Sequence, residues 1–253
     1  MTEQRYRATV EYDGTDFLGY QVQAEGRTVQ GEIEKSLRQV TGSNVRIDGA
    51  GRTDAGVHAT GQVIAFNVAW KHTLDDLHRA LNATLPRDIG VTDLTITNND
   101  FHPRFSALSR SYRYTVVNRP WPSVLQRWYS HHVREPLDVA AMRQAGKCLI
   151  GSHDFASFGK PPQGEVTVRK VTQAEWSADG ERVWFDITAN AFLYRMVRTI
   201  VGTLLQVGQG RIAVDDIEEI LTARDLTRSA APAPACGLCL MHIAYPDENA
   251  AEV

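Results

Sequence analysis

One short stretch of the chain combines a carboxylate with unusual backbone freedom. It reads Gly49-Ala-Gly-Arg52-Thr-Asp54-Ala-Gly-Val-His58, with three glycines around one arginine and one aspartate. Glycine permits positive φ and close backbone approach, so the stretch predicts a tight, exposed turn that presents polar side chains. A lone aspartate in a turn commonly caps the backbone. A carboxylate can also act as a nucleophile, which makes Asp54 the first candidate for chemistry.

The residues present exclude three other interpretations of this stretch: a dinucleotide-binding loop, a P-loop and a metal site. Its Gly-x-Gly could begin a dinucleotide-binding fingerprint, but the third glycine position holds Asp54, whose charge would repel a pyrophosphate. The chain has no Gly-Lys-Ser/Thr sequence, and so no P-loop. Asp54 and His58 are too few for a metal site, and Cys236-x-x-Cys239 has no second cysteine pair. The sequence therefore predicts neither a metal nor a cofactor.

A basic, aromatic segment occupies residues 101–134. It contains no Asp or Glu, although the whole chain has a net charge of −3. Arginines pair with phosphates and aromatic rings stack on unstacked bases, so the segment either binds RNA or forms a basic surface offset by acidic residues elsewhere. Arg110 and Tyr112 share one face of a predicted strand and are candidates for RNA binding. The six arginines are Arg104, Arg110, Arg113, Arg119, Arg127 and Arg134.

A second candidate lies in a long apolar stretch. Between residues 187 and 210 the only charged side chains are Arg195 and Arg198. In the helix predicted over residues 190–207, Arg198 has apolar neighbours one turn away, so it is expected to be partly buried and to need a partner. That partner is either a carboxylate, which matches the guanidinium fork, or backbone carbonyls.

Composition places the chain among soluble globular proteins. Its 253 residues are 43% hydrophobic and 23% charged, which suits one or two domains with a substantial core. Three cysteines favour a reducing compartment, and the N-terminus has no apolar signal region. No run of about 18 apolar residues is present, so no membrane span is predicted and a cytoplasmic location is expected.

The pattern of elements predicts an α+β fold in two ferredoxin-like halves with antiparallel sheets and a central cleft. In the first half we expect strands at residues 5–12, 45–48, 62–68 and 89–97, with helices at 28–41 and from 73 to 85. In the second half we expect strands at 108–118, 166–178, 182–188 and 238–245, helices at 137–149, 190–207 and 214–221, and a loop at 151–158. The domains are then 1–105 and 106–246, with a disordered tail at 247–253.

Several segments resemble those of the tRNA pseudouridine synthase A family. Residues 49–59, GAGRTDAGVHA, resemble its catalytic loop, and residues 109–114, SRSYRY, resemble the segment whose tyrosine stacks on the target uracil. Residues 190–198 resemble the helix whose final arginine pairs with the catalytic aspartate, and residues 237–240 resemble its closing strand. The resemblance covers nearly the whole chain.

The resemblance implies a role for each matched residue. It makes Asp54 the catalytic residue and Arg198 its charge partner. Arg52 would grip the RNA and assist extrusion of the base, and Tyr112 would stack on the uracil. Leu238 would supply an apolar wall beside it. Whether the aspartate attacks C6 of uracil or C1′ of ribose stays open.

The same resemblance implies the activity and the partners. The family isomerises uridines 38, 39 and 40 in the anticodon arm of tRNA, and it acts as a homodimer without metal or cofactor. Breaking the N1–C1′ bond and joining C5 to C1′ needs no redox step, so a chain without cofactor motifs can be this enzyme. Two alternatives remain open at this point: a non-catalytic RNA-binding module of ferredoxin-like fold, and a hydrolase that releases free uracil.

Overall fold

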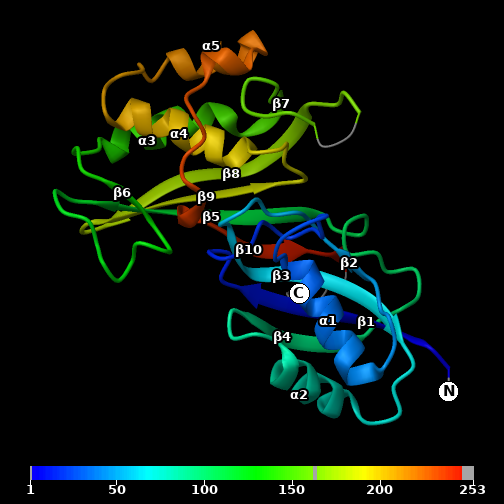
Figure 1. Ribbon diagram of the computed structural model, residues 1–253. Coiled ribbons are helices and arrows are strands. Elements are labelled where there is room, and N and C mark those ends of the chain that lie inside the picture. Colours follow the sequence, from blue (N-terminus) through cyan, green and yellow to red (C-terminus); the bar gives the residue numbers. More distant parts are fainter. Residues whose placement is uncertain (1, 162–163, 247–253) are drawn as a thin grey trace, which may run out of the picture. The chain divides into compact units, whose positions relative to one another are not determined.

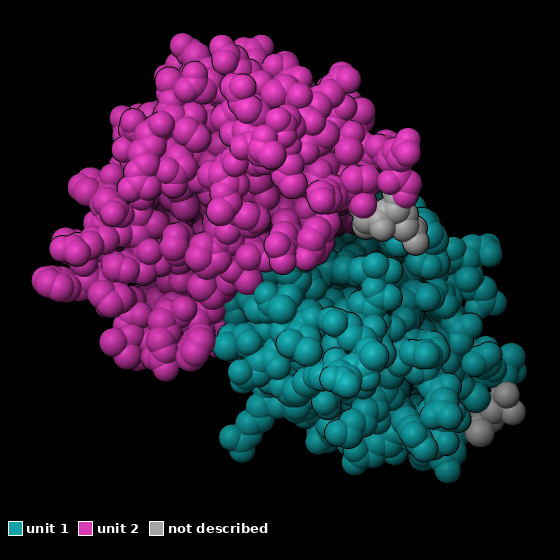
Figure 2. Space-filling model, turned by 45° about the horizontal axis from the view of Figure 1, so that its top comes forward, with its two compact units in different colours: residues 1–108, 240–253 teal, residues 109–239 magenta. Residues whose placement is uncertain are grey.

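The chain divides into two compact units (Figure 2). The structure is a computed structural model that describes residues 2–161 and 164–246. Unit 1 comprises Met1–Leu108 and Leu240–Val253, and unit 2 comprises Ser109–Cys239. The sequence-based division set the boundary after residue 105 and gave the last strand to the second half, whereas the structure assigns that strand from Leu240 onward to unit 1. The predicted tail, residues 247–253, lies outside the described residues.

Unit 1 has the strand–helix–strand–strand–helix–strand order predicted for a ferredoxin-like half (Figure 1). Its sheet runs β4-β1-β3, with β2 paired to β3, and every one of these pairings is antiparallel. Alternate residues of β1 are buried, as expected for a strand with one covered face, whereas β3 is buried along nearly its whole length. The strands are β1 (Gln4–Tyr12), β2 (Ile47–Gly49), β3 (His58–Val68) and β4 (Ile89–Ile96).

The two helices of unit 1, α1 (Val29–Thr41) and α2 (Leu74–Thr84), begin and end at the predicted signals. The Thr28 side chain accepts the N–H of Gly31, and α1 ends at Gly42 with φ 73°. Thr73 and Asp76 form a complete capping box at the start of α2. The helices contact each other through the hydroxyls of Ser36 and Thr84.

The strands of unit 2 are paired mostly in antiparallel fashion (Figure 1). Its strands follow the order β5-β9-β8-β7, and the short β6 pairs with β5 in parallel. Residues 151–158 were predicted as a loop, but residues 151–154 form strand β7 through pairing with residues 168–171 of β8. The strands are β5 (Ser109–Asn118), β6 (His131–Val133), β7 (Gly151–Asp154), β8 (Val168–Asp179) and β9 (Arg182–Ala189). Strand β10 (Leu238–Ala244) begins in unit 2 and continues in unit 1.

The helices of unit 2 include one that is buried along almost its whole length, α4. The prediction that this helix begins at residue 190 was wrong. Arg195 has φ 62°, and the Tyr194 N–H donates to the carbonyl of Lys160, so the chain turns before the helix starts. The helices are α3 (Val139–Gly146), α4 (Met196–Gly208) and α5 (Asp216–Ala223), and short 3-10 turns lie at Lys147–Leu149, Leu226–Arg228 and Ala235–Gly237.

The helices and the mostly antiparallel strands agree with the α+β class that the sequence predicted. In unit 2, α3 packs against both α4 and β8, and Figure 1 shows these helices over one face of the strands. Within the described part of the chain, no helix is both long enough and apolar enough to cross a membrane.

Candidate active site

The Asp54 loop, residues 50–57, joins β2 to β3 in unit 1. Its central residue, Thr53, is only 7% exposed, whereas Arg52 is exposed and Asp54 is half-buried. The N–H of Val57 donates to the Asp54 carbonyl over 3.1 Å and closes the tight turn that the glycines predicted. The loop therefore buries its threonine and leaves the arginine and the aspartate accessible.

Buried polar side chains form hydrogen bonds to residues of the Asp54 loop. The Thr53 Oγ1 lies 2.8 Å from the hydroxyl of Tyr12, and this pair is buried. Gln62, which is fully buried on β3, donates from Nε2 to the carbonyl of Gly51 over 3.0 Å. Because buried polar groups are costly to leave unpaired, each of these bonds favours one loop conformation. The sequence reasoning missed Tyr12 and Gln62, which look like ordinary strand residues.

Tyr20 is a buried aromatic residue that packs against the Asp54 loop. Its N–H donates to the Thr53 carbonyl over 3.1 Å, and its ring is 3% exposed. A Cβ at Gly49 would lie 2.4 Å from the Tyr20 hydroxyl oxygen, and one at Gly19 would lie 2.9 Å from the Thr53 carbonyl. Burial raises the pKa of Tyr20 well above its usual value, so the phenol stays neutral. The glycines thus allow an aromatic ring to pack directly under the loop.

His58 joins the loop to the turn after β1. Its Nδ1 accepts the N–H of Gly14 over 3.0 Å and lies 3.2 Å from the Asp13 carboxylate. Since Nδ1 accepts the Gly14 N–H, a neutral His58 ring in this arrangement carries its proton on Nε2. A Cβ on Gly14 would lie 2.0 Å from the carbonyl oxygen of Val57, so the two turns touch backbone to backbone.

In unit 2, Tyr112 and Arg110 lie on β5 and contact the segment that follows β9. The Tyr112 ring meets the Phe192 ring edge-on, with centroids 5.2 Å apart and an interplanar angle of 90°. Arg110 donates from Nη1 to the Asn190 carbonyl over 2.8 Å. Tyr112 is half-buried, so it keeps part of its ring accessible while Phe192 restricts its rotation. Phe192 had no predicted role.

Arg198 lies in the first turn of α4 and is half-buried, as predicted. Its Nε donates to the Ala233 carbonyl over 2.8 Å, so a backbone carbonyl is one of its partners. The Ala233 N–H returns a bond of 2.9 Å to the Arg198 carbonyl. Leu238, at the start of β10, is 5% exposed. Arg198, Leu238 and Tyr112 all belong to unit 2, whereas Asp54 and Arg52 belong to unit 1.

Four of the six arginines in the basic segment form two contrasting pairs. Arg113 makes a bidentate ion pair with Asp186, with distances of 2.7 and 2.9 Å, and Arg119 bonds Glu181 over 3.0 Å. The positive charges of these two arginines are therefore neutralised by carboxylates of unit 2. Arg134 and Arg127 are exposed, and the Arg127 guanidinium lies 4.8 Å from the ring centroid of Trp128. Only part of the segment's positive charge is therefore presented to solvent.

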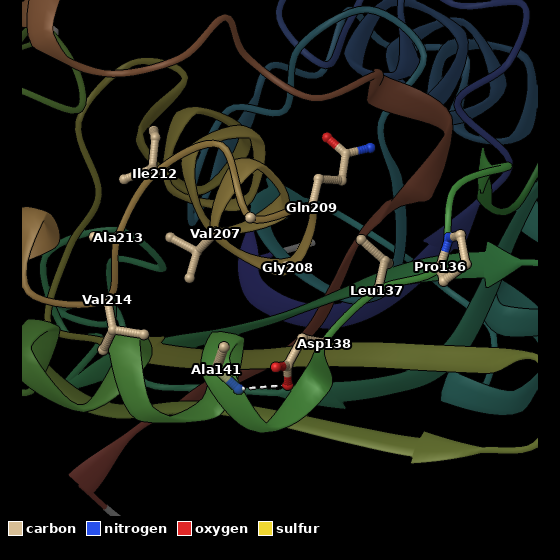
Figure 3. A pocket seen from close by; sticks show the side chains of 11 residues that line it. Pro136, Leu137, Asp138, Ala141, Val207, Gly208, Gln209, Ile212, Ala213 and Val214 are labelled. Atoms are coloured by element: carbon tan, nitrogen blue, oxygen red, sulfur yellow. Dashed lines mark hydrogen bonds between the residues drawn. The ribbon is translucent and has the colours of Figure 1, made fainter.

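A cavity of about 670 Å³ lies at the other end of α4 from Arg198 (Figure 3). Its lining is mostly apolar side chains and backbone, and its carboxylate, Asp138, accepts the N–H of Ala141 as the N-cap of α3. None of the predicted site residues lines it. Across residues 2–161 and 164–246, no group of three His, Cys, Asp or Glu side chains is placed to hold a metal ion.

Comparison with known proteins gives one consistent result. The family model for tRNA pseudouridine synthase matches residues 8–106 and 145–246. The tRNA pseudouridine synthase A of Brevibacillus brevis is 45% identical over 242 residues, which cover 95% of this chain and 99% of that protein. The one from Moorella thermoacetica is 44% identical, with coverages of 94% and 98%. The one from Caulobacter sp. is 42% identical, with coverages of 97% and 99%.

The family model includes the Asp54 loop and the first turn of α4, whereas β5, which carries Arg110 and Tyr112, lies outside the residues it matches. These matches favour an enzyme over a non-catalytic RNA-binding module, since the matched family is named for its reaction. The chain belongs to the tRNA pseudouridine synthase family.

Proposed function

We propose that this protein isomerises uridines 38, 39 and 40 in the anticodon stem-loop of tRNA to pseudouridine, with Asp54 as the catalytic carboxylate. The observation that carries the proposal is the Asp54 loop itself. An aspartate beside an exposed arginine is held on a turn fixed by Tyr12 and Gln62, within the matched family segment. A rigid support of this kind is what catalysis requires of a nucleophile.

The reaction needs one carboxylate and one base. The N1–C1′ bond of uridine breaks, the uracil turns, and C5 bonds to C1′. The proton on C5 is then lost to a base, and N1 gains a proton, so product and substrate have the same composition. Asp54 either adds to C6 of uracil or takes up C1′ of the ribose during the rotation, and both routes use the same carboxylate.

In this proposal Arg52 and four residues of unit 2 also serve the reaction. Arg198 is the charge partner of the Asp54 carboxylate, since its fork can bind two carboxylate oxygens at once. Tyr112, braced by Phe192, stacks on the uracil after the base has left its helix stack. Arg52 and Arg110 bind phosphates, and Leu238 gives the uracil an apolar neighbour.

We further infer that the protein acts as a homodimer in the cytoplasm. The support is an exposed apolar group in the turn between β5 and β6, where Trp121, Val124 and Leu125 are 75%, 71% and 89% exposed. Three strongly exposed apolar side chains within five residues of one loop are a candidate interaction surface. Leu125→Asp should therefore convert a dimer into a monomer, measured as mass by light scattering. A monomeric wild type, or a variant that stays dimeric, would count against this assignment.

The activity is tested with a tRNA transcript that carries tritium at C5 of its uridines. Each isomerisation releases one tritium to water, and sequencing after derivatisation maps the modified positions. Transcripts with cytidine at positions 38, 39 and 40 are the matched control. The proposal predicts release from the first transcript and none from the second. Equal release from both would overturn the site assignment, and free uracil would indicate hydrolysis instead.

A further inference from the structure

Residues 230–234, called the connector here, run along α4 with backbone against backbone. A Cβ at Gly202 would lie 2.1 Å from the Ala231 carbonyl oxygen. No side chain fits at that distance, so residue 202 must be glycine for the connector to lie where it does. The connector and α4 both belong to unit 2, and Gly202 lies one turn beyond Arg198.

The connector orients the Arg198 side chain. The Ala233 carbonyl accepts the Nε–H of Arg198 over 2.8 Å, while the Ala233 N–H donates to the Arg198 carbonyl over 2.9 Å. The same residue is thus bonded to both the main chain and the side chain of the arginine. Nε joins the aliphatic stem to the planar guanidinium group. This pair of bonds therefore fixes the direction in which the two Nη groups point.

Two hydroxyls hold the connector at its ends. The Tyr114 hydroxyl donates to the Pro234 carbonyl over 2.8 Å, and Thr203 Oγ1 accepts the Ala230 N–H over 3.1 Å. Tyr114 is 0% exposed, and a Cβ at Gly237 would lie 2.6 Å from its ring. Burial raises the pKa of Tyr114 well above its usual value, so its hydroxyl remains a donor.

The connector also borders a cavity of about 260 Å³. Residues 230–234 line it, together with side chains that include His131, Gln206 and Arg211. On this side the connector has open space rather than close packing. The hydrogen bonds to Tyr114 and Thr203, together with the close contact at Gly202, therefore decide where the Ala233 carbonyl lies.

We propose that Tyr114 and Gly202 are positioning residues for Arg198, acting through the connector and without touching the RNA. The proposal rests on the proposed function, in which Arg198 serves the catalytic carboxylate. It predicts that loss of the Tyr114 hydroxyl lets the Ala233 carbonyl move and the guanidinium turn away, while the binding of tRNA is unchanged.

Two variants test whether the connector affects catalysis. Tyr114→Phe keeps the ring and removes the bond, and it should lower kcat about five- to tenfold with KM for tRNA unchanged. Gly202→Ala should lower kcat further, about 10²-fold, since misplacement of about 1 Å has that effect on a catalytic group. The matched control is Tyr245→Phe, because Tyr245 is another buried tyrosine whose hydroxyl donates to a proline carbonyl, that of Pro103, over 2.8 Å.

An independent readout follows the Arg198 Nε–H directly by ¹⁵N NMR, with the resonance assigned by its disappearance in Arg198→Lys. In wild type and in Tyr245→Phe we expect slow exchange with water, and in Tyr114→Phe at least tenfold faster exchange. An unchanged resonance in Tyr114→Phe would overturn the proposal, and so would an unchanged kcat. If Arg198→Lys instead retained full activity, the role of Arg198 in the proposed function would fail, while the NMR result would still report on the connector.

Discussion

The Asp54 loop of unit 1 and the Arg198 turn of unit 2 are held by different kinds of contact. Under the loop, the supporting atoms include the Tyr12 hydroxyl and the Gln62 amide, beside the main-chain N–H of Tyr20. At Arg198 a backbone carbonyl, that of Ala233, is among the supporting atoms. A support made of side chains can be removed one residue at a time. A backbone support can be disturbed only through its neighbours, so the two halves of the proposed site should respond differently to mutation.

Among variants that leave Asp54 in place, the largest effect is expected from Arg198→Met. Arg198→Met keeps an unbranched, flexible stem of similar length to the arginine's aliphatic part, and removes both the charge and the bond to Ala233. In the proposed function Arg198 stabilises the charge of the catalytic carboxylate, and removing one such electrostatic group typically lowers turnover about 10²–10³-fold. The measurement is single-turnover tritium release at saturating enzyme. Undiminished turnover would show that Asp54 does not depend on Arg198.

Tyr112→Ala should affect catalysis more than binding, because contacts along the tRNA backbone remain. Stacking of a base on an aromatic ring contributes about 1–3 kcal/mol, so kcat should fall about 10–10²-fold. Tyr112→Phe is the control, since it retains the ring and its contact with Phe192. Filter binding gives the tRNA affinity, and equal losses in affinity and kcat would argue against a stacking role.

Thr53→Val tests the side-chain support of the loop. It removes the 2.8 Å bond to the Tyr12 hydroxyl inside the protein, at a cost of about 1–3 kcal/mol in the free energy of unfolding. Because the same bond fixes the loop, kcat should also fall about tenfold. Thr92→Val is the matched control, since Thr92 is exposed on β4 and its hydroxyl bonds only the Thr9 carbonyl over 3.4 Å among the contacts described. Denaturant unfolding measures the loss of stability, and tritium release measures kcat. A loss of stability with an unchanged kcat would show that the Thr53–Tyr12 bond stabilises the fold but does not position the loop for catalysis.

Local signals in the sequence predicted much of unit 1. The capping residues Thr28 and Thr73 and the terminal Gly42 act within one helical turn, so helices α1 and α2 were predicted at both ends. The Asp54 loop was equally clear, because its glycines, arginine and aspartate are consecutive. What lies under the loop was not predicted, since Tyr12 and Gln62 are 41 and 11 residues away from their partners.

The errors in unit 2 have the same origin. The start of α4 is decided by the left-handed conformation of Arg195 and by the bond from Tyr194 to Lys160, and neither has a signal in an apolar stretch that otherwise fits a helix. Strand β7 exists because it pairs with β8. The bond from Tyr114 to Pro234 spans 120 residues, so no reading of either neighbourhood could reveal it. Contacts distant in sequence decided each of these features.

The most direct test of the account is the Asp54→Asn variant, which keeps the size of the side chain and removes its charge and nucleophilicity. It is assayed with tritium-labelled tRNA beside the wild type, with its fold checked by circular dichroism and its tRNA affinity by filter binding. We expect an intact fold, wild-type affinity and a loss of tritium release of at least about 10⁴-fold. Release within about tenfold of wild type would show that another group performs the chemistry, and the Asp54 loop would then be a binding element.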